Sequence, residues 1–126
     1  MTSTRNILLA LAALSGLAAV AVGAFAAHGV ADPQAKDWLK TGASYQMWHA
    51  LAVYASTATL RRPSRGAALA PFLFLAGSAA FSGSLYAMAF GAPRWLGAVT
   101  PLGGLGLMAG WGALAWSAFR STDNGL

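Results

Sequence analysis

The side chains of this chain that could do chemistry are two histidines and a small set of phenol, amide and hydroxyl groups. They all stand in or beside long apolar runs, and they are His28, Tyr45, Gln46, His49, Ser82, Ser84, Tyr86 and Thr100. In the stretch TGASYQMWHALA, Tyr45 precedes His49 by four residues and Gln46 precedes it by three, so on a helix the three share a face. Such groups can hydrogen-bond one another or a ligand. Two histidines are also the minimum for a bis-imidazole haem site.

Chemistry beyond binding has little support in the sequence. No carboxylate lies near these residues to act as a general acid or to orient a histidine, and neither a nucleophile elbow nor a phosphate-binding loop is present. The chain has no cysteine, which excludes disulfides and thiolate metal sites. We therefore expect no catalytic residue, no metal site and no resident cofactor, and a protein that is not an enzyme.

The composition is typical of an integral membrane protein. Of its 126 residues 57% are hydrophobic and only 9% are charged, against about 25% charged in soluble domains. A soluble globule could not cover so much apolar surface. The net charge of +5 comes from basic residues scattered between apolar runs, so we expect no nucleic-acid partner. The expected partner is the lipid bilayer, around a single domain that spans residues 1–126.

Four apolar runs without any charged residue predict four membrane spans, at about residues 7–27, 42–60, 67–90 and 96–119. Each has the roughly 20 residues that a helix needs to cross a bilayer, and none alternates as a barrel strand does. The expected fold is all-α, an integral membrane four-helix bundle. The first run also has features of a signal peptide, with Arg5 before it and Ala24-Phe25-Ala26 as a cleavage site. Its length favours a retained span.

The basic residues predict an orientation. One side of the membrane would hold five arginines, Arg5, Arg61, Arg62, Arg65 and Arg120. The other side would hold Lys36, Lys40 and Arg94, which are partly offset by Asp32 and Asp37. Because cytoplasmic loops are enriched in Lys and Arg, we expect both termini to be cytoplasmic in a multi-pass protein of the plasma (inner) membrane.

The first outer loop has a helix signal of its own, in ADPQAKDWLKTG. Asp32 can cap a helix whose first residue is Pro33, and Gly42 or a neighbour would end it. The mixture of Trp, Leu, Lys and Asp suits a short helix lying at the membrane surface. An irregular loop is the alternative.

Small residues recur at helical spacing and predict close helix packing, which matters in lipid because apolar surface alone gives little drive to association. The glycines expected at helix contacts are Gly16, Gly23, Gly83, Gly103, Gly106 and Gly110. The sequence leaves open whether these faces meet within one chain or between copies in a homo-oligomer.

With this orientation the polar side chains gather in the outer half of the membrane. We expect His49 and Gln46 to bond with Ser82, Ser84 or Thr100, with His28 and Tyr45 nearer the headgroups. Such a network can simply fix packing. It can also be a site for a lipid, quinone or other small ligand, or bind haem.

The sequence leaves three function classes open. The favoured one is a non-enzymatic structural, accessory or ligand-binding component, alone or in a larger membrane complex. The second is an oligomeric transporter or channel, in which His49 is the span residue able to change charge near neutral pH. The third is a redox accessory that handles quinone or haem through His28 and His49.

Four motifs resemble those of the YgdD/YwdK-type bacterial inner-membrane proteins, a family of unknown function with a small eukaryotic transmembrane branch. They occur in the family's order over nearly the whole chain and are GAFAAHG (23–29), TGASYQMWHALA (41–52), FSGSLY (81–86) and LGAVTPLGGLGLMAGW (96–111). Ala26 replaces a glycine that is common in the family, a small-for-small change. The resemblance implies a four-helix protein of the plasma membrane and supplies no activity, substrate or catalytic residue.

Overall fold

The computed structural model describes residues 3–59 and 64–122, and the expected all-α fold is confirmed. The order of elements is α1 (Thr4–Gly29), α2 (Pro33–Thr59), α3 (Arg65–Ala89), a 3-10 turn η1 (Arg94–Ala98) and α4 (Val99–Thr122). Across these described ranges every regular element is helical.

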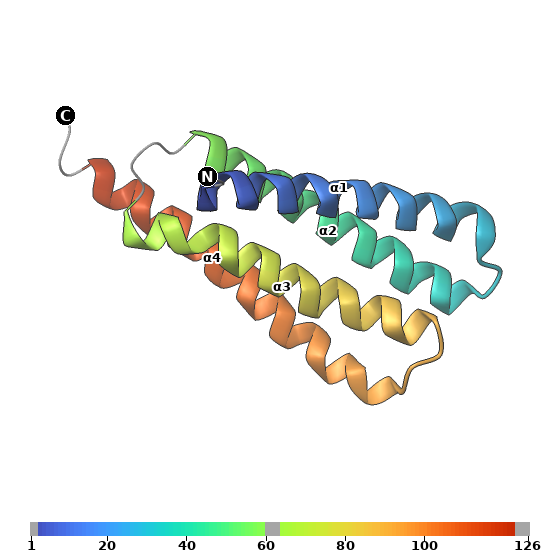
Figure 1. Ribbon diagram of the computed structural model, residues 1–126. Helices are drawn as coiled ribbons and strands as arrows, with labels where there is room; N and C mark the ends of the chain where they lie inside the picture. The colour runs from blue at the N-terminus through green and yellow to red at the C-terminus, as the bar shows by residue number, and fades with distance from the viewer. Residues whose placement is uncertain (1–2, 60–63, 123–126) are drawn as a thin grey trace.

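The four helices run up and down as two hairpins that lie side by side (Figure 1). The extensive contacts are those of α1 with α2, of α2 with α3 and of α3 with α4. Helices α2 and α3 are therefore the central pair. The beginning of α1 and the end of α4 lie at one end of the molecule, and the α1–α2 and α3–α4 connections lie at the other.

Local sequence explains where the helices begin and end. Ser3 and Ser64 accept hydrogen bonds from the backbone N–H groups three residues later, which caps α1 and α3. Asp32 caps α2 in the expected way, since its carboxylate accepts from the N–H of Ala35 at 2.8 Å. Helix α3 ends at Ala89, and Gly91, two residues further on, has a φ of 99°. The N–H groups of Gly91 and the following residue bond back to carbonyls in the last turn, as in a Schellman motif.

The prediction that Gly42 ends a separate surface helix is wrong. Helix α2 runs without interruption from Pro33 to Thr59. One face of its first turns is buried, with Leu39 only 1% exposed, while Gln34 and Lys40 in the same turns are exposed. Gly42 is needed for space, because a Cβ at this position would stand 2.5 Å from the Tyr86 ring. Within residues 3–59 and 64–122, the glycine that adopts a left-handed conformation is Gly91.

Three segments of the described chain are long and apolar enough to cross a membrane: Thr4–Gly29, Arg65–Ala89 and Arg94–Arg120. Helix α2, which was expected to supply the second span at 42–60, is not among them, and Leu60 lies outside the described residues. The mean hydropathy of α2 is lowered by polar side chains such as Gln46 and His49. Those side chains are sheltered because α2 packs between α1 and α3, as polar groups in lipid require.

The predicted packing glycines occupy different surroundings. Gly103 meets the backbones of Gly77 and Phe81, and Gly106 lies against Gly77, so α3 and α4 approach closely. A Cβ on Gly110 would stand 2.5 Å from the Phe74 ring. Two further glycines make ordinary contacts between α1 and α2, namely Gly16 with Met47 and Ala50, and Gly23 with Ala43. Gly83 has open space beside it, with nothing within 4 Å of an added Cβ.

Candidate functional site

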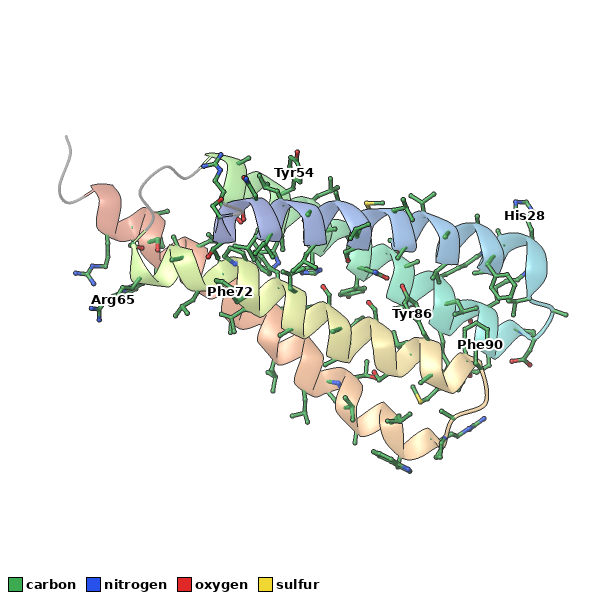
Figure 2. All side chains as sticks on the ribbon, in the orientation of Figure 1. His28, Tyr54, Arg65, Phe72, Tyr86 and Phe90 are labelled. Carbon is green, nitrogen blue, oxygen red and sulfur yellow. The ribbon has the colours of Figure 1, made fainter. Side chains whose placement is uncertain are left out.

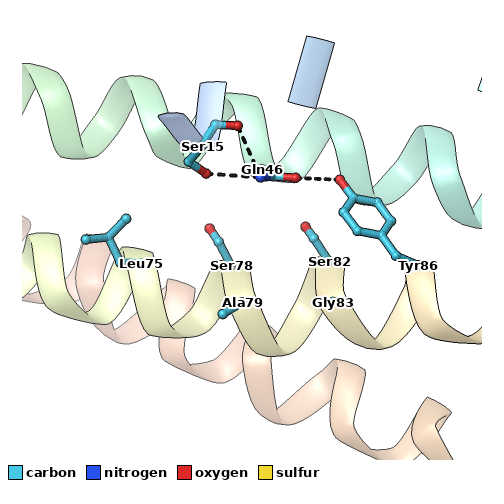
Figure 3. Close-up of a pocket in the computed structure, with 8 residues that line it drawn as sticks. All are labelled: Ser15, Gln46, Leu75, Ser78, Ala79, Ser82, Gly83 and Tyr86. Atoms are coloured by element: carbon cyan, nitrogen blue, oxygen red, sulfur yellow. Dashed lines mark hydrogen bonds between the residues drawn. The ribbon is translucent and has the colours of Figure 1, made fainter. Parts of the chain in front are cut away.

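A partly open hollow of about 220 Å³ lies between α1, α2 and α3 (Figure 3). We call it the α3 hollow, because most of its lining belongs to that helix. The lining residues are Ser15, Gln46, Leu75, Ser78, Ala79, Ser82, Gly83 and Tyr86. Gln46, Ser82 and Tyr86 were predicted as site residues, and Gly83 was predicted as a packing residue.

Gln46 joins all three helices at the hollow. Its Nε2 donates to the backbone carbonyl of Ser15 at 3.1 Å and to the Ser15 hydroxyl at 3.2 Å. Its Oε1 accepts from the Tyr86 hydroxyl at 2.6 Å. The Ser15 carbonyl can only accept, so this pattern fixes which end of the amide faces α1. The amide is therefore held in one orientation by α1 and α3.

Two stripes of side chains run along α3 beside each other. The inner stripe is polar and consists of Ser78, Ser82 and Tyr86. The outer stripe is apolar and consists of Leu75, Ala79 and Gly83. Members of each stripe are four residues apart, so each stripe keeps to one line along the helix. The hollow thus has a polar floor and an apolar rim.

Ser78 lacks a hydrogen-bond partner. It is 7% exposed, and its hydroxyl is one of two buried side-chain polar atoms without a partner in the described part of the chain. Figure 3 shows the hydroxyls of Ser78 and Ser82 pointing from α3 toward Gln46 and Ser15. The Ser82 hydroxyl donates to the Gly42 carbonyl at 2.7 Å. Buried polar groups are nearly always paired, so the Ser78 hydroxyl is available to bond an occupant of the hollow.

His49 lies in a second cluster that faces α4. Its Nδ1 is 2.7 Å from the Tyr45 carbonyl, and its Nε2 accepts from the Trp111 indole N–H at 3.1 Å. The aromatic rings of Tyr45, Phe74 and Trp111 stand around the imidazole. Because a carbonyl can only accept and an indole N–H can only donate, Nδ1 is the donor and Nε2 the acceptor in these two bonds. Both ring nitrogens are therefore used: Nδ1 bonds within α2, and Nε2 bonds α2 to α4.

The expected pairing of the polar residues is therefore wrong in detail. Tyr45, Gln46 and His49 are neighbours on α2, but Gln46 bonds to α1 and α3 while His49 bonds to α4. Ser84 bonds instead with Thr100 at 2.6 Å, where α3 meets the start of α4. A side chain at the border between two faces of a helix can bond to either of two neighbouring helices. The residue spacing along its own helix does not determine which of them it bonds to.

His28 lies far from His49. It is exposed in the last turn of α1, and Figure 2 shows it at the end of the molecule near the α1–α2 connection. Ser15 and Gln46 are at the same level, and His28 is thirteen residues beyond Ser15 toward that end. His49 is three residues beyond Gln46 in the opposite direction, so about 24 Å of helix axis separates the histidines. These positions do not fit bis-imidazole ligation, and no group of three potential metal-ligating His, Asp or Glu residues occurs in the described segments.

The polar residues also extend deeper than expected. Gln46 is the central residue of the 27-residue α2, and its partner Ser15 lies near the middle of α1. The polar stripe of α3 begins near the middle of that helix at Ser78 and reaches its last turn at Tyr86. The cluster is thus a strip from mid-helix to one end rather than a single layer.

Sequence reasoning missed three residues of these clusters. Ser15 and Ser78 are isolated hydroxyls within apolar runs, and nothing local distinguishes them from other small residues. Trp111 lies in the fourth apolar run and was not among the predicted site residues. The signal available for Ser78 was its four-residue spacing from Ser82 and Tyr86, which places the three on one line.

Long apolar helices that enclose a small polar hollow define this chain as a helical, multi-pass integral membrane protein. Residues 22–104 match the family described as "Protein of unknown function (DUF423)". A UPF0382 membrane protein of Haemophilus influenzae is 43% identical over 120 residues, covering 93% of this chain and 97% of the relative. UPF0382 inner membrane protein YgdD of Escherichia coli is 35% identical over 127 residues, covering 98% and 97%.

The chain belongs to this family of membrane proteins of unknown function, and the resemblance read from its motifs is confirmed. Its place is the inner membrane, where its helices lie in the lipid bilayer. A relative from Staphylococcus haemolyticus, 37% identical over 119 residues, bears the name of a UPF0382 membrane protein as well. No solved structure gives a significant match.

Proposed function

We propose that this protein is a non-enzymatic component of the inner membrane that binds a small uncharged molecule in the α3 hollow. The observation that carries the proposal is the unpaired, buried hydroxyl of Ser78 at the floor of the hollow. A network that only fixes packing would be expected to satisfy every buried polar group. Here the N–H groups and the oxygen of the neighbouring Gln46 amide all have partners, while Ser78 keeps its hydrogen-bonding capacity for an occupant.

The size of the hollow supports an occupant larger than one water. Its volume is about 220 Å³, and a water molecule takes about 30 Å³ in the liquid. Because no lining residue is charged, an ionic ligand would be buried without a counter-charge at considerable cost.

A transporter of the same molecule, acting as an oligomer, is the second candidate. The position of Gln46 and Ser15 near the middle of their helices favours it, since transport sites commonly lie near the bilayer midplane. Binding without transport is the simpler proposal, because the hollow lies within one chain and is lined by uncharged residues only. Movement of the bound molecule across the membrane of a liposome that contains the protein would support the transporter.

Native mass spectrometry of protein extracted gently from its own membrane tests the proposal. We expect an added mass on the wild type that is lost or reduced in Ser78→Ala. Ser84→Ala is the control, because it removes another buried hydroxyl of α3, one that bonds with Thr100 outside the hollow. The bare chain mass in all three proteins would contradict ligand binding.

A further inference from the structure

We infer that the α3 hollow holds the hydroxyl head of an uncharged lipid alcohol, with the apolar tail leaving over the rim of α3 into the bilayer. This inference rests on the proposed binding function and names the chemical class of the ligand. Three features of the hollow carry it: the direction of its hydrogen bonds, its two-sided lining and its size.

The hydrogen bonds leave more acceptors than donors. Four hydroxyls line the hollow, on Ser15, Ser78, Ser82 and Tyr86. The Ser82 hydroxyl donates its hydrogen bond to the Gly42 carbonyl, and the Tyr86 hydroxyl donates its hydrogen bond to Gln46 Oε1. The oxygens of both still carry lone pairs. An occupant must therefore donate a hydrogen bond to use this surface fully.

Ser78 adds the complementary requirement. Its hydroxyl is unpaired and can donate as well as accept. A ligand hydroxyl can donate to Ser82 or Tyr86 and accept from Ser78 at the same time. A quinone carbonyl or an ether oxygen can only accept, so it would leave the lone pairs of the floor unused. The arrangement favours an alcohol over a quinone.

The lining and the volume indicate how the rest of the ligand lies. The polar stripe of α3 is buried at Ser78 and Ser82, whereas Ala79 and Gly83 on the apolar stripe are exposed. A hollow of about 220 Å³ is below the roughly 300–1,000 Å³ of sites that enclose a whole drug-sized ligand. It therefore accommodates a head group, and the exposed apolar rim provides the exit for a tail.

The test uses the full chain in phosphatidylcholine nanodiscs and hexadecanol that carries a photoreactive diazirine near its hydroxyl end. We expect saturable labelling of α3 at the rim of the hollow. Unlabelled hexadecanol should displace the probe at about tenfold lower concentration than hexadecyl methyl ether or a benzoquinone with a decyl tail, since one hydrogen bond is worth up to about tenfold in affinity. Ser78→Ala should remove most of this preference, and Ser84→Ala should keep it.

The outcomes separate this inference from the function on which it rests. Equal or better displacement by the ether or the quinone overturns the alcohol, and so does labelling that hexadecanol cannot displace. If the native mass spectrum still shows an added mass that Ser78→Ala removes, ligand binding stands and only its class is wrong. If that mass is absent as well, both proposals fail.

Discussion

At the residue scale, the polar side chains of α2 bond to the other three helices in different ways. Gln46 joins α1 and α3 through its amide, since Nε2 donates to Ser15 and Oε1 accepts from Tyr86. His49 accepts from Trp111 of α4 and bonds back to its own helix. We therefore predict that His49 is a structural residue rather than a ligand or coupling residue, because both of its ring nitrogens already have hydrogen-bond partners.

This role of His49 can be measured with a double-mutant cycle. Trp111→Phe removes the indole donor and leaves Nε2 of the buried imidazole unpaired, so we expect a loss of stability. In membrane proteins such bonds contribute about 0.6–2 kcal/mol, and a coupling energy of that order should appear with His49→Leu. The measurement is reversible unfolding in mixed micelles.

Trp95→Phe is the matched control, because Trp95 is 68% exposed in η1. It should change stability little. A coupling energy of zero between His49 and Trp111 would mean that the bond contributes nothing to holding α2 and α4 together.

Individual residues were the part of the site hardest to predict. The polar stretch around Gln46 and His49 was visible, since three hydrogen-bonding groups within five residues are rare in an apolar run. Their partners were not visible, because a partner is chosen by how helices rotate against each other. Ser15, which completes the Gln46 bonds, stands thirty-one residues away in the chain and has no neighbour that hints at its use.

At the scale of elements, α3 has two unlike sides. One side meets α4 so closely that a Cβ on Gly77 would stand 2.9 Å from the backbone nitrogen of Leu107. The other side forms the floor and the rim of the hollow. Helix α3 thus packs tightly against α4 and leaves the hollow on the side that faces α1 and α2.

The close approach predicts a sharp difference between two glycines of α4. A Cβ on Gly103 would overlap the backbone nitrogen of Phe81, whereas a Cβ on Gly112 has nothing within 4 Å. Gly103→Ala should therefore destabilise the protein by about 1–3 kcal/mol, as overpacking typically does. Gly112→Ala should be neutral or slightly stabilising, since alanine is the better helix former. Unfolding in mixed micelles measures both, and equal effects would contradict the close α3–α4 contact.

The elements were more predictable than their boundaries. Long apolar runs and the Asp32-Pro33 start are local signals, and both appear in the structure as expected. Gly42 was wrongly predicted to end a helix, because glycine is common both at helix ends and at close contacts between helices. The contact that explains it, with Tyr86, spans forty-four residues and leaves no trace in the sequence around it.

At the scale of the whole molecule, charge divides the two ends. Arg5, Arg65 and Arg120 lie where α1 and α3 begin and where α4 ends, and these sites share one end of the molecule in Figure 1. The opposite end carries Lys36 and Arg94. The positive-inside rule then predicts that the arginine end is cytoplasmic.

Cysteine labelling tests this orientation cleanly, because the chain has no cysteine of its own. Asn6 and Gln34 are both exposed, near opposite ends of the molecule. A membrane-impermeant maleimide added to intact cells or spheroplasts should label Gln34→Cys and spare Asn6→Cys until the membrane is broken. Labelling of Asn6→Cys from outside would reverse the orientation.

The overall architecture followed from composition, but the place of α2 within it did not. A chain with 9% charged residues must be embedded, and four runs allow four helices. The least apolar of them became a central helix, because its polar groups can be satisfied between α1 and α3 and not in lipid. The hollow exists where those three helices meet, so no single run of sequence could reveal it.

The most direct test of the account compares Gly83→Phe and Gly112→Phe by native mass spectrometry after gentle extraction from the membrane. Both glycines are exposed helical positions with open space beside them, but only Gly83 lines the hollow. We predict that a large side chain at the rim removes the added mass carried by the wild type, while the same side chain on α4 leaves it in place. An added mass that survives Gly83→Phe would place the ligand elsewhere and contradict binding in the α3 hollow.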